Sequence, residues 1–228
     1  MREVCLYTIS GFLYRNRMSK SKKAVSAPPK ERSEALTDHL LDVAGKFFLE
    51  KGFEGASVSQ IARHAHASKE TFYSRFPNKE ELFRAVIRRR TDIMAAELGT
   101  VLVPHALPAK ALTSFGEFML DLVLSEETIA LRRTLSMQWR QFPELTRIFY
   151  ELGPARTIGS LAKYLEEQVS HGRLRKLNSQ IAARQFMDLL ASEMVMRASL
   201  GIFPKPTKSE KRRKVKNTVE FFLRGYGV

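Results

Sequence analysis

The sequence predicts an all-α protein in which a small N-terminal helical domain precedes a larger helical domain. Apolar residues recur at spacings of three and four along most of the 228-residue chain, which is the period of a helix that buries one face. Nowhere do apolar and polar residues alternate as they do in a half-buried strand. Segments with Gly or Pro, such as VLVPHALPAK and GIFPKP, interrupt the apolar runs and predict breaks between helices.

Composition favours a polyanionic partner. A net charge of +14 fits a protein that binds either nucleic acid or an anionic membrane surface. Cys5 is the single cysteine, so an intramolecular disulfide and a cysteine-based metal site are excluded, which fits a reducing cytoplasm. No apolar run approaches the length of a membrane span. Basic residues follow the first apolar segment, which argues against a signal peptide, and Met18 is an alternative start.

Residues 1–32 are predicted to form a flexible basic arm. From Arg15 to Arg32 this segment holds seven basic residues and one acidic residue. Such an arm can reach the DNA minor groove beside a bound domain. A second basic run, KSEKRRKVK at 208–216, is predicted to be a solvated helix face, with a nucleic-acid contact as the alternative.

Three helices are predicted within residues 33–78, and a connecting helix within 79–104. The first helix carries a clear apolar stripe and ends at Gly52, where a left-handed residue is favoured. The second begins at Ser57, whose spacing from Gln60 predicts a capping box. The third is short, and we expect its outer face to carry the function.

This third helix lies in the segment KETFYSRF. Ser68 is predicted to cap its start, and Pro77 disfavours helical geometry at its end. Placing Phe72 and Phe76 inward turns the remaining side chains outward or to the flanks: Lys69, Glu70, Thr71, Tyr73 and Ser74. A short helix with such a face fits the major groove, which is about 12 Å wide. A helix, a tight turn and a short helix together predict a helix-turn-helix.

The start of the connecting helix gives a second indication of DNA binding. Asn78 is predicted to cap it, with Glu81 three residues further on. Lys79 stands in the first turn, where the helix dipole disfavours a cation. A bound phosphate would compensate that charge, and the amides at a helix start would help to hold it.

The segment GASVSQIARHAHASKETFYSRFPNKEELFRAV resembles the DNA-binding region of TetR-family transcriptional regulators. The resemblance covers about Leu40 to Val86, and His66 departs from it because the family usually has glycine in the turn. It implies phosphate contacts from Ser57, Thr71, Tyr73 and Lys79. It implies base contacts from Lys69, Glu70 and Ser74, with Ser59 as a further contributor and Ser68 at the helix start. A carboxylate can accept from the cytosine amino group, so Glu70 predicts a C·G pair.

The resemblance implies that residues 105–228 form a ligand-binding and dimerisation domain. The apolar spacing there predicts helices near 112–124, 128–141, 143–151, 155–171, 179–200 and 208–224. The segment FPELTRIFYELGPARTIGSLAKYLEEQVSHGRLR resembles C-terminal domains of TetR relatives that control efflux pumps. The candidate ligand-binding residues are Phe115, Phe118, Met119, Trp139, Phe142, Phe149 and Tyr150. The candidate dimerisation residues are Phe186, Leu189, Leu190, Met194, Val219, Phe222 and Leu223. Packing within one chain would explain both sets equally well.

The sequence thus predicts a cytoplasmic repressor that binds a palindromic operator in double-stranded DNA as a homodimer. The resemblance implies release by a small apolar or amphipathic effector, with efflux genes as candidate targets, and no cofactor, metal or membrane partner. One alternative is a basic helical protein that binds anionic membranes, or nucleic acid without sequence preference. Another is a regulator that activates or has no ligand. An enzyme is disfavoured, because His64 and His66 lie on different helix faces and no catalytic motif occurs.

Overall fold

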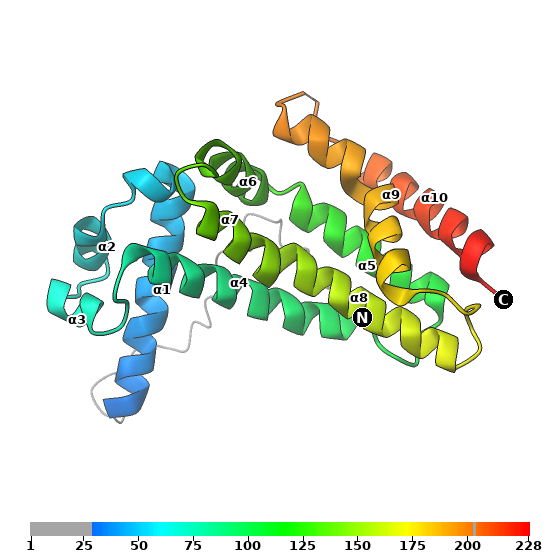
Figure 1. The fold of residues 1–228 in the computed structure, drawn as a ribbon, viewed down its shortest axis with the longest axis horizontal. Helices are drawn as coiled ribbons and strands as arrows, with labels where there is room; N and C mark the ends of the chain where they lie inside the picture. The colour runs from blue at the N-terminus through cyan, green and yellow to red at the C-terminus, as the bar shows by residue number, and fades with distance from the viewer. Residues whose placement is uncertain (1–28, 203) are drawn as a thin grey trace, which may run out of the picture. The chain divides into compact units, whose positions relative to one another are not determined.

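The computed structural model describes residues 29–202 and 204–228, and within these ranges the chain forms helices and loops (Figure 1). No strand occurs among the described residues, where an isolated antiparallel bridge joins Leu174 and Gly227. This confirms the all-α prediction. Most of the predicted basic arm lies outside the described residues. The first helix begins at Pro29, so residues 29–32 are helical and do not belong to a flexible arm as predicted.

Two compact units divide the chain between Asp38 and His39. In the first unit, the described residues form the opening turns of α1, where the Thr37 hydroxyl donates to the Ser33 carbonyl at 2.9 Å. The second unit holds the rest of α1 (Pro29–Gly55) and all later helices. In α1 the predicted break is present, because Gly52 has φ 69°.

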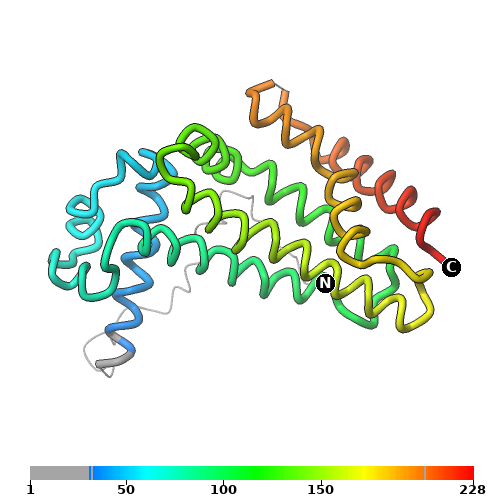
Figure 2. Tube along the Cα trace, in the orientation of Figure 1, coloured from blue at the N-terminus to red at the C-terminus, as the bar shows by residue number. Residues whose placement is uncertain are grey.

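The helix-turn-helix region follows α1 and ends at a long connecting helix. It consists of α2 (Val58–His64), α3 (Lys69–Tyr73) and α4 (Lys79–Val101), whose order is followed most easily along the trace in Figure 2. Phenylalanine rings pack α4 against α1, where Phe83 comes from α4 and Phe48 and Phe53 come from α1. Phe48 lies 5.7 Å from Phe53 and 5.3 Å from Phe83, measured between ring centroids.

The remaining helices form the larger part of the second unit. They are α5 (Pro108–Val123), α6 (Glu126–Gln138), α7 (Pro143–Tyr150), α8 (Arg156–Ser170), α9 (Ser179–Ser199) and α10 (Lys208–Tyr226). A π-helical turn, Glu151–Ala155, joins α7 to α8 where the sequence predicted a break. Pro154 lies inside this turn, and because it has no N–H the chain widens there and still continues as a helix.

The core of this part lies among α5, α8, α9 and α10, and Figure 1 shows α9 and α10 side by side. Gly116 on α5 permits a close approach of α10, since a Cβ there would lie 2.9 Å from a Val215 methyl group. A larger side chain at residue 116 would therefore separate the two helices.

Burial corrects most of the predicted dimerisation set. Phe186, Leu190, Val219 and Phe222 are buried within the chain, so packing in one protomer explains them. Met194 and Leu223 are partly buried against the same core. Leu189 is exposed and still available to a partner. The helical stripe was correctly identified, but it covers the protomer's own core.

The helix caps follow the predictions except at α2. Asn78 Oδ1 accepts from the Glu81 amide at 2.8 Å, as expected. Ser57 is the N-cap residue of α2, but its side chain makes no capping bond there. Gln60, its predicted partner, accepts instead from Lys51 Nζ at 3.1 Å. The capping box is found at α10, where Thr207 and Glu210 bond reciprocally.

Candidate nucleic-acid interface

The α2–α3 segment presents a polar face over a thin buried layer. Phe72 is fully buried and Phe76 nearly so, with their ring centroids 5.7 Å apart. Tyr73, between them, keeps 51% of its surface exposed. The other exposed residues of this region are Ser57, Ser59, Ser68, Lys69, Glu70 and Ser74, while Thr71 is half-buried. The predicted inward and outward assignment of α3 is therefore confirmed.

A left-handed residue turns the chain from α2 into α3. His66 has φ 52°, an uncommon value for a residue with a side chain. Its amide donates to the Arg63 carbonyl at 3.1 Å, and the Ala67 amide donates to the Ala62 carbonyl at 2.9 Å. These two bonds form the Schellman arrangement that usually has glycine at its centre. His66 therefore keeps the tight turn without that glycine.

Two hydroxyl groups fix the start of α3. Ser68 Oγ accepts from the Thr71 amide at 3.0 Å and lies 2.8 Å from Thr71 Oγ1. This confirms Ser68 as the helix cap. Both hydroxyls already have a partner within the protein, so their first role is to hold α3 in place. Their contacts with DNA stay predictions.

Ser74 and Glu70 differ in what they can offer to a base edge. The Ser74 hydroxyl donates to the Thr71 carbonyl at 2.9 Å, and its oxygen accepts from Arg75 Nη1 at 3.5 Å, which leaves one lone pair as an acceptor. Within the described part of the chain, the exposed Glu70 carboxylate has no ion pair or hydrogen bond. Both side chains would therefore accept rather than donate, which suits the amino groups of cytosine and adenine in the major groove.

Lys79 is held by the last residues of α1, which follow the kink at Gly52. Its Nζ donates to the Glu54 carbonyl at 2.9 Å and lies 4.7 Å from the centroid of the Phe53 ring. Burial lowers the Lys79 pKa, while the charges of Glu80 and Glu54 oppose that effect. An ammonium group has three donors, so a phosphate contact remains open to Lys79.

The same end of α1 contacts the segment that follows α6. The Gln141 side-chain amide donates to Glu54 Oε1 at 3.3 Å. Phe142 packs its ring 5.0 Å from the Phe53 ring. Phe53 and Glu54 therefore touch both Lys79 and the segment after α6. Phe142 is a predicted ligand-binding residue, and no local pattern indicated this long-range contact with Phe53.

The other predicted ligand-binding residues are dispersed. Phe115 and Met119 are buried in the core, and Phe118 packs against it. Trp139 and Tyr150 are each 53% exposed. The seven residues do not line either of the two cavities described here, and their ligand-binding role stays a prediction.

Two other kinds of site are absent from the described ranges. No helix between residues 29 and 202 or between 204 and 228 is long and apolar enough to cross a membrane. In the same ranges, no group of three His, Cys, Asp or Glu side chains is placed to hold a metal ion.

Two family models match the chain. The model of bacterial regulatory proteins of the tetR family matches residues 40–86, which contain α2 and α3. The model of the C-terminal domain of AefR-like transcriptional repressors matches residues 110–228. The second match alone covers more than half of the chain.

A curated relative agrees with these matches. The HTH-type transcriptional regulator RutR of Escherichia coli (strain K12) is 34% identical over 130 residues, which are 57% of this chain and 50% of RutR. The aligned region thus spans about half the length of that relative.

Solved structures extend the likeness to most of the chain. A TetR-family transcriptional regulator from Mesorhizobium loti MAFF303099 has a TM-score of 0.79 and 27% identity, over 86% of this chain and 99% of that one. The flavonoid-responsive regulator FrrA has a TM-score of 0.67 and 30% identity, over 85% and 98% of the two chains.

Proposed function

The chain belongs to the TetR family of transcriptional regulators, and from that premise we propose that it represses genes by binding an inverted-repeat operator as a homodimer. The observation that carries the proposal is the outer face of α3. Tyr73 is 51% exposed beside the fully buried Phe72, and the polar residues of α3 share the exposed side. A face of this kind can contact base edges when α3 enters the major groove.

The proposed contacts divide into two groups. Base contacts come from Lys69, Glu70 and Ser74, with Ser59 at the side. Phosphate contacts come from Ser57, Thr71, Tyr73 and Lys79. The first group decides the sequence that is bound, and the second holds the protein on the duplex.

We place the dimer contact on the exposed side of α9 and α10. A groove of about 850 Å³ runs between these helices and is lined by Leu189 and Phe221 among others. Phe221 is 66% exposed and Leu189 is 40% exposed, which is unusual for large apolar residues. Two copies that bury this groove against each other would present two α3 helices to one operator.

A small apolar or amphipathic effector would release the operator. One similar protein, FrrA, is described as flavonoid-responsive, which supports a small-molecule effector for this chain. An effector acts only if it binds more tightly to the dimer state whose α3 helices are wrongly spaced for DNA. Control of efflux genes rests on the resemblance of residues 142–175 alone. The cytoplasm, which contains the DNA, is the proposed location.

Selection of binding sites from random duplex DNA tests the proposal. The purified full chain should enrich an inverted repeat, and fluorescence anisotropy should show far tighter binding to it than to unrelated DNA at several salt concentrations. Sedimentation of the complex should give two protomers for each operator. Enrichment of no sequence, together with a salt dependence typical of a simple polycation, would contradict sequence-specific recognition.

The alternative is binding to anionic surfaces without sequence preference. The net charge of +14 is the observation that favours it. Vesicles with and without anionic lipid distinguish the two functions. Only the alternative predicts that anionic vesicles displace the protein from the selected operator as effectively as they displace it from unrelated DNA. A promoter–reporter assay then tells repression from activation.

A further inference from the structure

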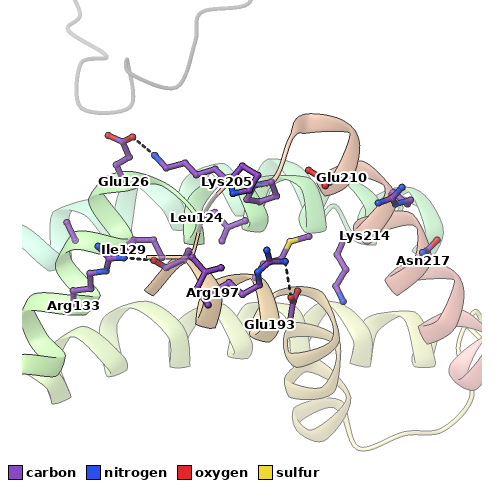
Figure 3. A pocket seen from close by; sticks show the side chains of 17 residues that line it. Leu124, Glu126, Ile129, Arg133, Glu193, Arg197, Lys205, Glu210, Lys214 and Asn217 are labelled. Atoms are coloured by element: carbon purple, nitrogen blue, oxygen red, sulfur yellow. Dashed lines mark hydrogen bonds and ion pairs between the residues drawn. The ribbon is translucent and has the colours of Figure 1, made fainter. Parts of the chain in front are cut away.

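A cavity of about 560 Å³ lies between α6, the C-terminal part of α9 and the N-terminal half of α10 (Figure 3). It is separate from the α9–α10 groove, although Lys214 borders both. Its volume is within the range of about 300–1,000 Å³ that small-molecule sites occupy in proteins. None of the residues assigned to DNA binding lines it.

One part of the lining is apolar. Leu124 follows α5, Ile129 belongs to α6, and Met194 belongs to α9. Ala130 and Ala198 add two small side chains from α6 and α9. Met194 is partly buried against the protein core, so this side of the cavity continues the apolar interior. An apolar tail placed here would leave water without exposing the core.

The rest of the lining is charged, with more cations than anions. Three acidic residues line the cavity: Glu126, Glu193 and Glu210. The five cationic residues are Arg133, Arg197, Lys205, Arg213 and Lys214. A small anion therefore meets a net positive wall.

Three of these cationic side chains form hydrogen bonds or ion pairs with other groups of the protein. The Arg133 guanidinium donates to the Ala198 and Ser199 carbonyls at the end of α9, at 2.6 and 2.8 Å. Arg197 pairs with Glu193 at 3.4 Å, and Lys205 pairs with Glu126. These contacts use carbonyl groups and carboxylates that border the cavity, and they fix its walls.

Arg213 and Lys214 are the two remaining cationic residues of the lining. Within the described part of the chain, neither makes an ion pair or a hydrogen bond. The remaining carboxylate, Glu210, accepts from the Thr207 amide at 2.7 Å and from the Thr207 hydroxyl at 2.8 Å. Those bonds, with the charges of Arg213 and Arg197, lower the Glu210 pKa, so this carboxylate stays ionised as a helix cap. Arg213 thus lies in the field of Glu210 without a direct contact to it, and Arg213 and Lys214 keep their donors available to a ligand.

We propose that this cavity binds a small organic carboxylate with an aliphatic tail. The carboxylate lies between Arg213 and Lys214, and the tail lies against Leu124, Ile129 and Met194. Two cations whose donors make no hydrogen bond or direct ion pair within the described residues favour an anionic group, and the adjacent apolar wall favours a molecule with an apolar end. This inference rests on the proposed function, because it names a chemical class and a site for the small effector, but its binding test requires neither DNA nor a particular operator.

Isothermal titration calorimetry with octanoate tests the site, using the full-length protein in the absence of DNA. The neutral analogue 1-octanol has the same chain and lacks the carboxylate. We expect octanoate to bind about tenfold more tightly than 1-octanol, the usual strength of a charge-assisted hydrogen bond. Because no DNA is present, the result for octanoate binding does not depend on whether the protein recognises an operator.

Variants then locate the bound octanoate. The double change Arg213→Gln, Lys214→Gln should weaken octanoate binding about tenfold and leave 1-octanol unchanged. Arg224→Gln is the matched control, since it removes a charge from an exposed position of α10 outside the cavity, and it should have no effect. Ala130→Leu fills the apolar part and should weaken both molecules.

Three results would overturn the proposal. The first is equal binding of octanoate and 1-octanol. The second is octanoate binding that Ala130→Leu and the double change leave intact. The third is loss of binding in Phe221→Ser with no loss in Ala130→Leu, which would place octanoate in the α9–α10 groove. Circular dichroism confirms that each variant has kept its helices.

Discussion

In the α2–α3 segment, contacts between residues a few positions apart fix the fold and the exposed face together, whereas α9 and α10 depend on contacts between distant parts of the chain. Ser68 caps α3 through Thr71, three residues further on. Phe186 on α9, by contrast, packs 5.3 Å from Phe222 on α10, measured between ring centroids. In the α2–α3 segment an apolar stripe therefore identifies the buried side of the helix. In α9 and α10 it does not show whether the stripe packs within the protomer or against a partner.

This contrast explains why one set of predicted residues is exposed as expected and another is not. Phe72 and Phe76 have one possible buried side, because the helix is short and its outer positions are polar. On α9 an apolar stripe can cover its own core or a second protomer, and both require the same residue types. Four predictions can break or sharpen the comparison.

The largest effect is expected at α3. Phe72→Ala should lower the free energy of unfolding by about 3–5 kcal/mol, because Phe72 is fully buried. Tyr73→Ala should change that free energy by less than about 1 kcal/mol, since Tyr73 is 51% exposed, and should instead weaken operator binding. Chemical denaturation of both variants measures the difference. Equal destabilisation by the two changes would mean that α3 lacks a distinct outer face.

A second pair of neighbours tests α10. Phe222→Ala should cost about 3–5 kcal/mol of unfolding free energy, as Phe222 is only 2% exposed. Phe221→Ser should leave the protomer folded and weaken dimerisation, because Phe221 is 66% exposed beside the groove. Sedimentation over a range of concentrations measures the dimer. If Phe221→Ser has the same dimer constant as the unchanged protein, the dimer contact lies elsewhere.

Lys79 and Glu70 should affect DNA binding in different ways. Lys79→Ala should weaken binding to all sequences and reduce the salt slope by about one, as expected for one lost phosphate contact. Glu70→Ala should leave the slope nearly unchanged and lose about 1–3 kcal/mol of preference for a C·G pair. Anisotropy titrations with operators that differ at single base pairs measure both. An unchanged base preference in Glu70→Ala would remove Glu70 from the base contacts.

The smallest effect is expected at Tyr164, on α8. Its hydroxyl donates to the Ala106 carbonyl at 3.1 Å, so Tyr164→Phe should lower the free energy of unfolding by about 1 kcal/mol at neutral pH. Burial raises the Tyr164 pKa to about 12. The unfolded chain ionises first, near pH 10, so this residue's stabilisation is lost as the pH rises from about 10 to about 12.

Denaturation at several alkaline pH values checks this sign. The difference in unfolding free energy between the unchanged protein and Tyr164→Phe should shrink and then reverse as the pH approaches 12. A difference that stays constant from neutral pH to 12 would show that Tyr164 ionises alike in the folded and unfolded chains.

By itself, the sequence determined the all-α class, nearly every helix position and the outer face of α3. These depend on short-range physics: Ser68 caps α3, Asn78 caps α4, and Gly52 takes a positive φ. The bonds involved join residues at most a few positions apart, so their spacing is visible in the chain itself. Even there Ser57 forms no capping box, and the Gln60 side chain accepts from Lys51 instead.

Only the tertiary structure decided which distant residues meet. It placed Phe142 against Phe53, buried Phe222 while exposing Phe221, and brought α6, α9 and α10 together around a charged cavity. A residue's type limits which contacts it can make, but the partner is chosen by how whole helices pack. That choice depends on every other side chain in the core, so no local spacing in the sequence reveals it.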